Sequence, residues 1–130
     1  MIFRLGRLEY LMSQDQPWYL TIAPYGPHAP AVPCARHDKL FANAKAPRLP
    51  WWNPDDDIQS QKSVFLKNAS RMNDTEIAGS DSAFRHRLQT LQGVDDIVND
   101  VIAKLEEKGE LDNTYGECPG LVFVRPSSCL

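Results

Sequence analysis

The stretch that decides the fold is DSAFRHRLQTLQGVDDIVNDVIAKLEEKG, residues 81–109. Its apolar side chains recur every three or four residues, the spacing that gathers them on one face of an α-helix. These side chains are Phe84, Leu88, Leu91, Val94, Ile97, Val98, Val101, Ile102 and Leu105. Ser80 or Asp81 would cap the first turn, and Gly109 would take the left-handed conformation after the last. The sequence therefore predicts one long helix over residues 82–108.

Two further patterns lie upstream of this helix. Leu5, Leu8 and Leu11 have helical spacing, so residues 3–13 are predicted to form a short amphipathic helix. The run WYLTIA, residues 18–23, is rich in aromatic and β-branched side chains, and it predicts a strand buried on both faces of a sheet. Residues 35–79 follow neither pattern and are predicted to form a long irregular loop.

These elements define the expected fold class. One buried strand, one long irregular loop and one long helix cannot enclose a hydrophobic core, because the apolar face of each needs a further layer to cover it. The predicted fold class is therefore α/β, and the 130 residues are expected to be a slice of a larger domain.

The composition argues against several classes of protein. The chain is 42% hydrophobic and 24% charged, as soluble globular domains are, and no apolar run approaches the roughly 20 residues of a membrane-spanning helix. A net charge of −3 provides no broad basic face, so neither nucleic acid nor a membrane span is expected. Arg7 and Glu9 interrupt any apolar region of a signal peptide, so no signal peptide is visible.

Proline is concentrated in one part of the chain. Eight of the ten prolines lie between positions 17 and 54, and the segment APYGPHAPAVP, residues 23–33, has one about every three residues. Proline lacks a backbone N–H, which disfavours both a helix and a central strand there. This segment is expected to be an ordered, extended loop at the end of the preceding strand, and it carries His28.

Three groups of residues, in this order, resemble one family. PWYLTIAP at 17–24 is followed by PHAP at 27–30; APR at 46–48 is followed by WN at 52–53; FRHRLQTL at 84–91 leads through VDD at 94–96 to GELDNTY at 109–115. Together they resemble type I sulfatases, the arylsulfatase family, and within it the branch that contains N-acetylglucosamine-6-sulfatase. The resemblance covers about residues 8–115 and implies that residues 1–115 are part of a catalytic domain with an alkaline-phosphatase-like α/β fold.

The resemblance also implies a chemistry: hydrolysis of sulfate esters with a formylglycine nucleophile, made from Cys or Ser, and a calcium ion. Only His28 can be carried over from the family's functional residues, because it matches the loop histidine that faces the sulfate ester. It is therefore expected to be a catalytic and substrate-binding residue that donates a proton to the bridging oxygen. A histidine between prolines can also simply hydrogen-bond its own loop, and this alternative stays open.

The rest of this machinery is not found in the sequence. Cys34, Cys118 and Cys129 do not lie in the Cys-x-Pro-Ser-Arg motif that yields formylglycine, and the family's metal-ligating segments do not occur. The chain is therefore expected to hold neither formylglycine nor calcium and to be a truncated, inactive piece of a sulfatase. The alternative is a non-catalytic binding protein that keeps a sulfatase-derived loop, while a phosphate-ester hydrolase of the same superfamily is less favoured.

Residues 116–130 depart from the resemblance. After Tyr115 the chain reads GECPG where the family has Ser-Asp-Asn-Gly, and GEC can be encoded by DNA that contains a common intron start. This divergent tail is therefore predicted to be translated intron.

Two tripeptides match the acceptor pattern for N-linked glycans, Asn68-Ala69-Ser70 and Asn73-Asp74-Thr75. They fit the secreted or lysosomal/vacuolar location that the resemblance implies, so glycans are expected on Asn68 and Asn73. Such tripeptides also arise by chance in polar loops.

Overall fold

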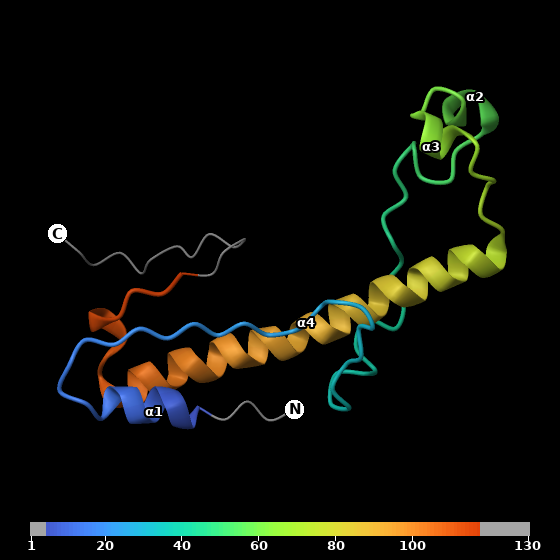
Figure 1. Cartoon of the computed structure of the whole chain (residues 1–130). Helices are drawn as coiled ribbons and strands as arrows, with labels where there is room; N and C mark the ends of the chain where they lie inside the picture. The colour runs from blue at the N-terminus through green and yellow to red at the C-terminus, as the bar shows by residue number, and fades with distance from the viewer. Residues whose placement is uncertain (1–4, 118–130) are drawn as a thin grey trace. The chain divides into compact units, whose positions relative to one another are not determined.

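The computed structural model describes residues 5–117, and Figure 1 labels the α-helices of this range. In chain order these are α1 (Gly6–Met12), α2 (Asp56–Gln59), α3 (Val64–Lys67) and α4 (Asp74–Lys108), followed by the 3-10 helix η1 (Leu111–Asn113). The described residues form two compact units, Thr21–Asp95 and, separately, residues 5–20 together with 96–117. No helix of this range is both long enough and apolar enough to span a membrane. Most of the predicted tail, residues 118–130, lies outside the described residues.

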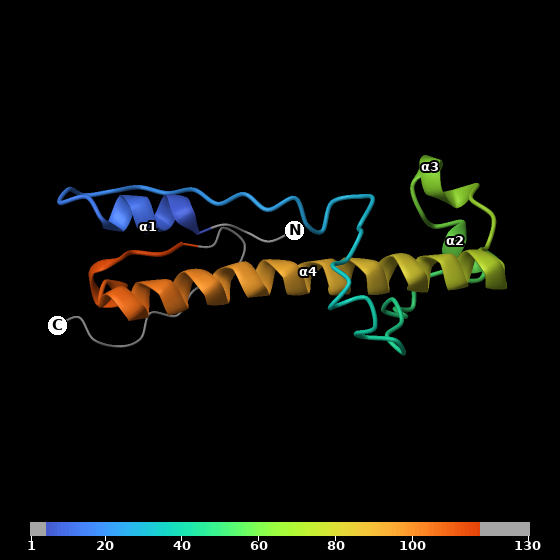
Figure 2. The ribbon, with the colours of Figure 1, turned by 90° about the horizontal axis from the view of Figure 1, so that it is seen from below.

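The predicted long helix is confirmed as α4, which Figures 1 and 2 show as one continuous helix. It ends at Lys108, as expected, and Gly109 follows with a φ of 70°. The N–H of Glu110 donates to the carbonyl of Leu105 at 2.9 Å, which satisfies a carbonyl of the last turn. Glycine adopts this left-handed conformation without the steric penalty of a Cβ, so the end of the helix follows from the sequence.

The predicted start of the helix is wrong, because α4 begins at Asp74. The N-cap is Asn73, not Ser80 or Asp81: its Oδ1 accepts from the N–H groups of Thr75 and Glu76 at 3.0 and 3.1 Å. Glu76 reaches back, and its Oε2 accepts from the N–H of Asn73 at 2.8 Å. These reciprocal bonds form a capping box, which stabilises a first turn that has no continuous apolar face.

The structure does not show the strand predicted for residues 18–23. No strand is assigned in residues 5–117, and the side chain of Tyr19 is 85% exposed, so this segment is not buried on both faces. The physical reason is that a strand is stabilised by pairing with a neighbour, and the described residues contain no other strand.

The region predicted to be a long irregular loop contains the short helices α2 and α3 and the first turns of α4. Asn53, before α2, is hydrogen-bonded to Met72, after α3, so the two ends of this segment are joined. Nδ2 of Asn53 donates to the carbonyl of Met72 at 3.1 Å, and its Oδ1 accepts from the N–H of Met72 at 2.6 Å. Gln59 lies within this segment and donates to the carbonyls of Leu66 and Ala69. Side-chain amides bonded to backbone groups therefore give order to a segment that lacks an apolar pattern.

The second unit holds two buried leucine side chains. Leu8 of α1 is 1% exposed and Leu105 of α4 is 3% exposed. Helix α1 confirms the short amphipathic helix predicted for residues 3–13 within its described part, since residues 3 and 4 lie outside the described residues. Nearby, Nζ of Lys104 lies 3.1 Å from Oε1 of Glu9 and 2.7 Å from Oε2 of Glu107. The hydrogen bond with Glu107, and then that with Glu9, raises the pKa of Lys104.

Candidate functional site

The segment that carries His28 forms a tight turn. The N–H of His28 donates to the carbonyl of Tyr25 at 3.0 Å, and the Gly26–Pro27 and Ala29–Pro30 peptide bonds are both cis. The His28 side chain is exposed, and its Nδ1 lies 2.7 Å from the carbonyl oxygen of Ala29. Residues 23–33 form a non-helical loop, as predicted, although no strand is assigned before it in residues 5–117, and His28 lies at its exposed surface.

Gly26 brings this loop against α4. A Cβ at Gly26 would lie 2.8 Å from Cγ2 of Thr90 and 3.7 Å from Cγ2 of Val94, and the first of these distances is shorter than van der Waals contact allows. Glycine is needed here because the backbone itself packs against the helix. Thr90 is fixed in turn, since its hydroxyl donates to the carbonyl of His86 at 2.7 Å. The residue directly before the PHAP stretch therefore packs against the FRHRLQTL stretch.

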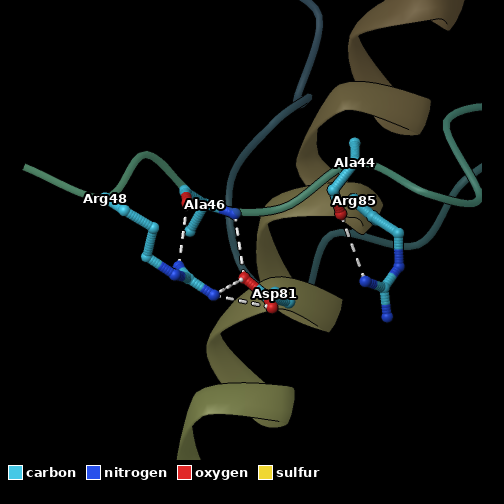
Figure 3. A network of polar contacts seen from close by, with 5 residues as sticks. All are labelled: Ala44, Ala46, Arg48, Asp81 and Arg85. Atoms are coloured by element: carbon cyan, nitrogen blue, oxygen red, sulfur yellow. Dashed lines mark hydrogen bonds and ion pairs between the residues drawn. The ribbon is translucent and has the colours of Figure 1, made fainter.

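A second loop is attached to α4 through Asp81, which Figure 3 shows in close-up. Nη2 of Arg48 donates to both carboxylate oxygens of Asp81, at 2.7 and 2.8 Å, and the N–H of Ala46 donates to Oδ1 at 2.9 Å. The same guanidinium donates to the carbonyl of Ala46 at 2.8 Å and lies 3.8 Å from the centre of the Trp52 ring. The APR and WN stretches thus form one assembly around this carboxylate.

The charge of Asp81 is stabilised where it lies. The hydrogen bond from Arg48 holds the pKa of the Asp81 carboxyl below its ordinary value; partial burial opposes this, and the N–H of Ala46 supports it. Asp81 is 8% exposed, so its carboxylate depends on these donors rather than on water. The sequence had indicated a helix cap at this position, whereas the residue lies inside α4 and holds a loop.

Two more side chains of α4 hold the same loop. Nε2 of Gln89 donates to the carbonyls of Asp38 and Leu40, both at 2.8 Å, and Nη1 of Arg85 donates to the carbonyl of Ala44 at 3.2 Å. The Arg85 contact is drawn in Figure 3. Asp81, Arg85 and Gln89 are four residues apart, so they share one face of the helix.

Sequence reasoning missed Asp81 and Gln89 as anchors, although a signal was present. Asp81 precedes Phe84 by three residues and Leu88 by seven, so a carboxylate falls on the apolar stripe of the helix. A polar side chain in that register indicates a buried partner, since burying it without one is costly. Its identity could not be read, because Arg48 is more than thirty residues away in the sequence.

The two glycosylation acceptors lie at helix ends, and both are exposed. Asn68 is the C-cap residue of α3, and Asn73 is the N-cap residue of α4. The Asn73 cap uses the side-chain oxygen, so it leaves the side-chain nitrogen, the atom that a glycan would join, outside these bonds.

The described residues do not fit a calcium ion. Residues 5–117 contain no group of three or more His, Cys, Asp or Glu side chains that could hold a metal. In the acidic run at 55–57, Asp55 instead forms an ion pair with Arg71, and Asp56 and Asp57 lie in the first turn of α2. Cys34 is a half-buried thiol followed by Ala35 and Arg36, so it does not match the formylglycine motif.

Comparisons with known proteins cover the part of the chain that holds these stretches. A family model described as Sulfatase matches residues 5–115. Sulfatase ppz1 of Metarhizium majus is 35% identical over 113 residues, which cover 80% of this chain and 26% of that protein. Human N-acetylglucosamine-6-sulfatase is 36% identical over 113 residues, which cover 85% of this chain and 20% of that protein.

A third relative, the putative extracellular sulfatase Sulf-1 homolog of Caenorhabditis elegans, is 36% identical over 102 residues, 77% of this chain and 14% of that protein. The chain thus spans only 14–26% of the length of these three relatives. No solved structure matches it. The family model covers most of the chain, and the chain therefore belongs to the sulfatase family.

Proposed function

We propose that residues 5–115 are part of the catalytic domain of a sulfatase and that His28 contacts the sulfate ester. Membership of the family supports the reaction class. One observation supports this role of His28. The turn that holds His28 packs against α4 at Gly26, while the imidazole itself stays exposed. An anchored backbone with an accessible ring suits a group that must meet a substrate in a fixed orientation.

The chemistry proposed for His28 is general acid catalysis. The imidazolium donates its Nε2 proton to the bridging oxygen of the ester as the bond from sulfur to that oxygen breaks, so the alcohol departs neutral. The family resemblance implies a formylglycine nucleophile and a calcium ion as well. The described residues fit neither group, so the proposed role of His28 concerns proton donation alone.

We also propose that residues 18–23 form a strand in the sheet of an alkaline-phosphatase-like α/β domain. The aromatic and β-branched run WYLTIA supports this, as does its non-helical course. The turn that carries His28 would then follow the end of that strand, the usual place for binding residues in α/β domains.

Glycosylation at Asn68 and Asn73 and a secreted or lysosomal/vacuolar location are part of the same proposal. The exposure of both acceptors supports it, and so does the relative that is named an extracellular sulfatase.

The experiment is an assay of the full-length gene product with an aryl sulfate and, in parallel, an aryl phosphate. Phenol release from the sulfate is expected, and His28→Ala should lower kcat by about 10²–10⁴-fold, the usual contribution of a general acid. The matched control is His86→Ala, because His86 is also exposed but lies on α4. An unchanged kcat in His28→Ala would contradict the role of His28.

The same assay tests the other functions. Faster turnover of the phosphate would overturn the reaction class, and binding of the sulfate without turnover would favour a non-catalytic binding protein. The 130-residue chain alone is expected to release no phenol, since its sequence has no formylglycine motif.

A further inference from the structure

Two side chains of the His28 turn converge on one carbonyl oxygen. Nδ1 of His28 lies 2.7 Å from the oxygen of Ala29, and the hydroxyl of Tyr25 donates to the same oxygen at 3.2 Å. The rings of Tyr25 and His28 also touch, with centroids 4.8 Å apart and planes inclined by 48°. Tyr25 therefore contacts the imidazole directly and shares its hydrogen-bond acceptor.

This geometry fixes the position of one proton. A carbonyl oxygen can only accept, so Nδ1 of His28 must carry the hydrogen that lies between the two atoms. In the neutral ring, Nε2 then has the lone pair; in the imidazolium, Nε2 carries an N–H. Because Nδ1 faces the oxygen of Ala29, Nε2 is the ring nitrogen left for a ligand.

The backbone of the turn ties Tyr25 to the same arrangement. The N–H of His28 donates to the carbonyl of Tyr25 at 3.0 Å, which brings the two side chains to the same end of the turn. Gly26, between them in the sequence, packs against Thr90 of α4, which supports the turn. Rotation of the imidazole about its side-chain bonds would break both the ring contact and the bond to Ala29.

We propose that Tyr25 is a positioning residue for His28, which holds the imidazole as the Nδ1–H tautomer with Nε2 directed to the sulfate ester. The inference deepens the proposed function and rests on it for the identity of the ligand. Tyr25 acts through His28 and is not itself required to touch the substrate. Its ring limits the orientations of the imidazole, and its hydroxyl holds the Ala29 carbonyl in place.

The first experiment is a long-range ¹H–¹⁵N NMR spectrum of the full 130-residue chain, in which the ¹⁵N shifts of an imidazole identify its tautomer. The wild-type chain is expected to show His28 as the Nδ1–H form. Tyr25→Phe keeps the ring contact and should retain that form, whereas Tyr25→Leu should shift His28 toward the Nε2–H form that free imidazole side chains favour in water. His37 and His86 serve as internal references in the same spectra.

The matched control is Tyr115→Leu, which also removes an exposed tyrosine, 78% exposed against 68% for Tyr25. It should leave the His28 signals unchanged. An Nε2–H form of His28 in the wild-type chain would overturn the proposal without any variant. If His28 keeps the Nδ1–H form in Tyr25→Leu, Tyr25 does not position it. The same conclusion follows if Tyr115→Leu changes the tautomer of His28 as much as Tyr25→Leu does.

The second experiment separates this inference from the proposed function. In the full-length gene product, Tyr25→Leu should lower kcat about tenfold and leave KM nearly unchanged, with Tyr25→Phe restoring most of the activity, because the loss comes from misorientation. If the tautomer of His28 depends on Tyr25 but kcat does not depend on His28, then Tyr25 positions His28, and the catalytic role of His28 is wrong. If kcat depends on His28 but Tyr25→Leu behaves as wild type in both experiments, the positioning role of Tyr25 is wrong, while the catalytic role of His28 remains.

Discussion

At the scale of single residues, buried polar side chains of α4 attach loops to the helix, a role that apolar packing has in most domains. In the unit Thr21–Asp95, the buried side chains of α4 include Asp81 and Gln89, at 8% and 5% exposure. Each donates to or accepts from the backbone of a loop, so removal of one would leave loop backbone groups without their partners. These residues therefore determine where the loops of that unit lie on the helix.

Asp81 gives a prediction that depends on pH. Because its pKa is lower in the folded chain than the ordinary value of 3.8, its ion pair stabilises the fold above that value. This contribution is lost as the pH falls through the lowered pKa. Asp81→Asn should therefore lower the free energy of unfolding at neutral pH, and the difference from wild type should shrink below pH 3.8.

Urea unfolding of both chains at several pH values measures this difference. The control is Asp95→Asn, since Asp95 is an exposed carboxylate on the same helix that accepts from Gln92 at 2.9 Å. It should change the stability little at any pH. A constant difference between wild type and Asp81→Asn down to acid pH would contradict the assignment.

At the scale of elements, some boundaries could be predicted from the sequence and others could not. The end of α4 was predictable because Gly109 provides a local conformational signal. The start was not, because the apolar register begins at Phe84, whereas a polar capping box at Asn73 starts the helix earlier. The strand predicted for residues 18–23 is not seen in the described residues, and strands depend on partners that local sequence does not contain.

Some features of the candidate site could likewise be predicted from the sequence, and others could not. The turn at residues 23–33 was predictable from its prolines, whose missing N–H groups exclude regular structure. Its contact with Thr90 and the pairing of Arg48 with Asp81 were not, because they join residues far apart in the sequence. The role of His28 stays a prediction.

The N-cap of α4 gives a prediction at this scale. Asn73→Ala removes the side-chain oxygen that accepts from two N–H groups, and loss of such a cap costs about 1 kcal/mol. Thr75→Ala removes the same glycosylation acceptor pattern but leaves the cap intact. In protein made without glycans, only Asn73→Ala should therefore be destabilised when thermal unfolding is followed by circular dichroism.

Expression in a glycosylating host completes this test. Both variants should lose one glycan, seen as faster migration on a denaturing gel, if Asn73 is modified as proposed. Equal destabilisation of the two variants in the unglycosylated protein would contradict the capping role. Equal migration of wild type and both variants would contradict glycosylation at this position.

At the scale of the whole molecule, apolar burial is scarce in the described residues and exposed apolar side chains are frequent. Phe65 is 93% exposed and Tyr19 is 85% exposed, whereas few apolar side chains of the described residues are buried, Leu8 and Leu105 among them. Large aromatic side chains are commonly covered in a complete domain, because burying them contributes strongly to stability. This distribution is consistent with the proposal that the chain forms part of a larger catalytic domain.

The two compact units give the last prediction, because their stabilising contacts differ in kind. The unit made of residues 5–20 and 96–117 holds Leu8 and Leu105, whereas Thr21–Asp95 is held by side-chain bonds to backbone. Leu8→Ala should therefore cost about 2–5 kcal/mol, the usual effect of truncating a buried leucine. Amide hydrogen exchange should accelerate in α1 and in the last turns of α4, while the amides of residues 81–90 keep their protection. Leu66→Ala is the control. Leu66 is 56% exposed, so its truncation should leave amide exchange in both units unchanged. Equal acceleration at residues 81–90 in Leu8→Ala would show that the two units do not unfold separately.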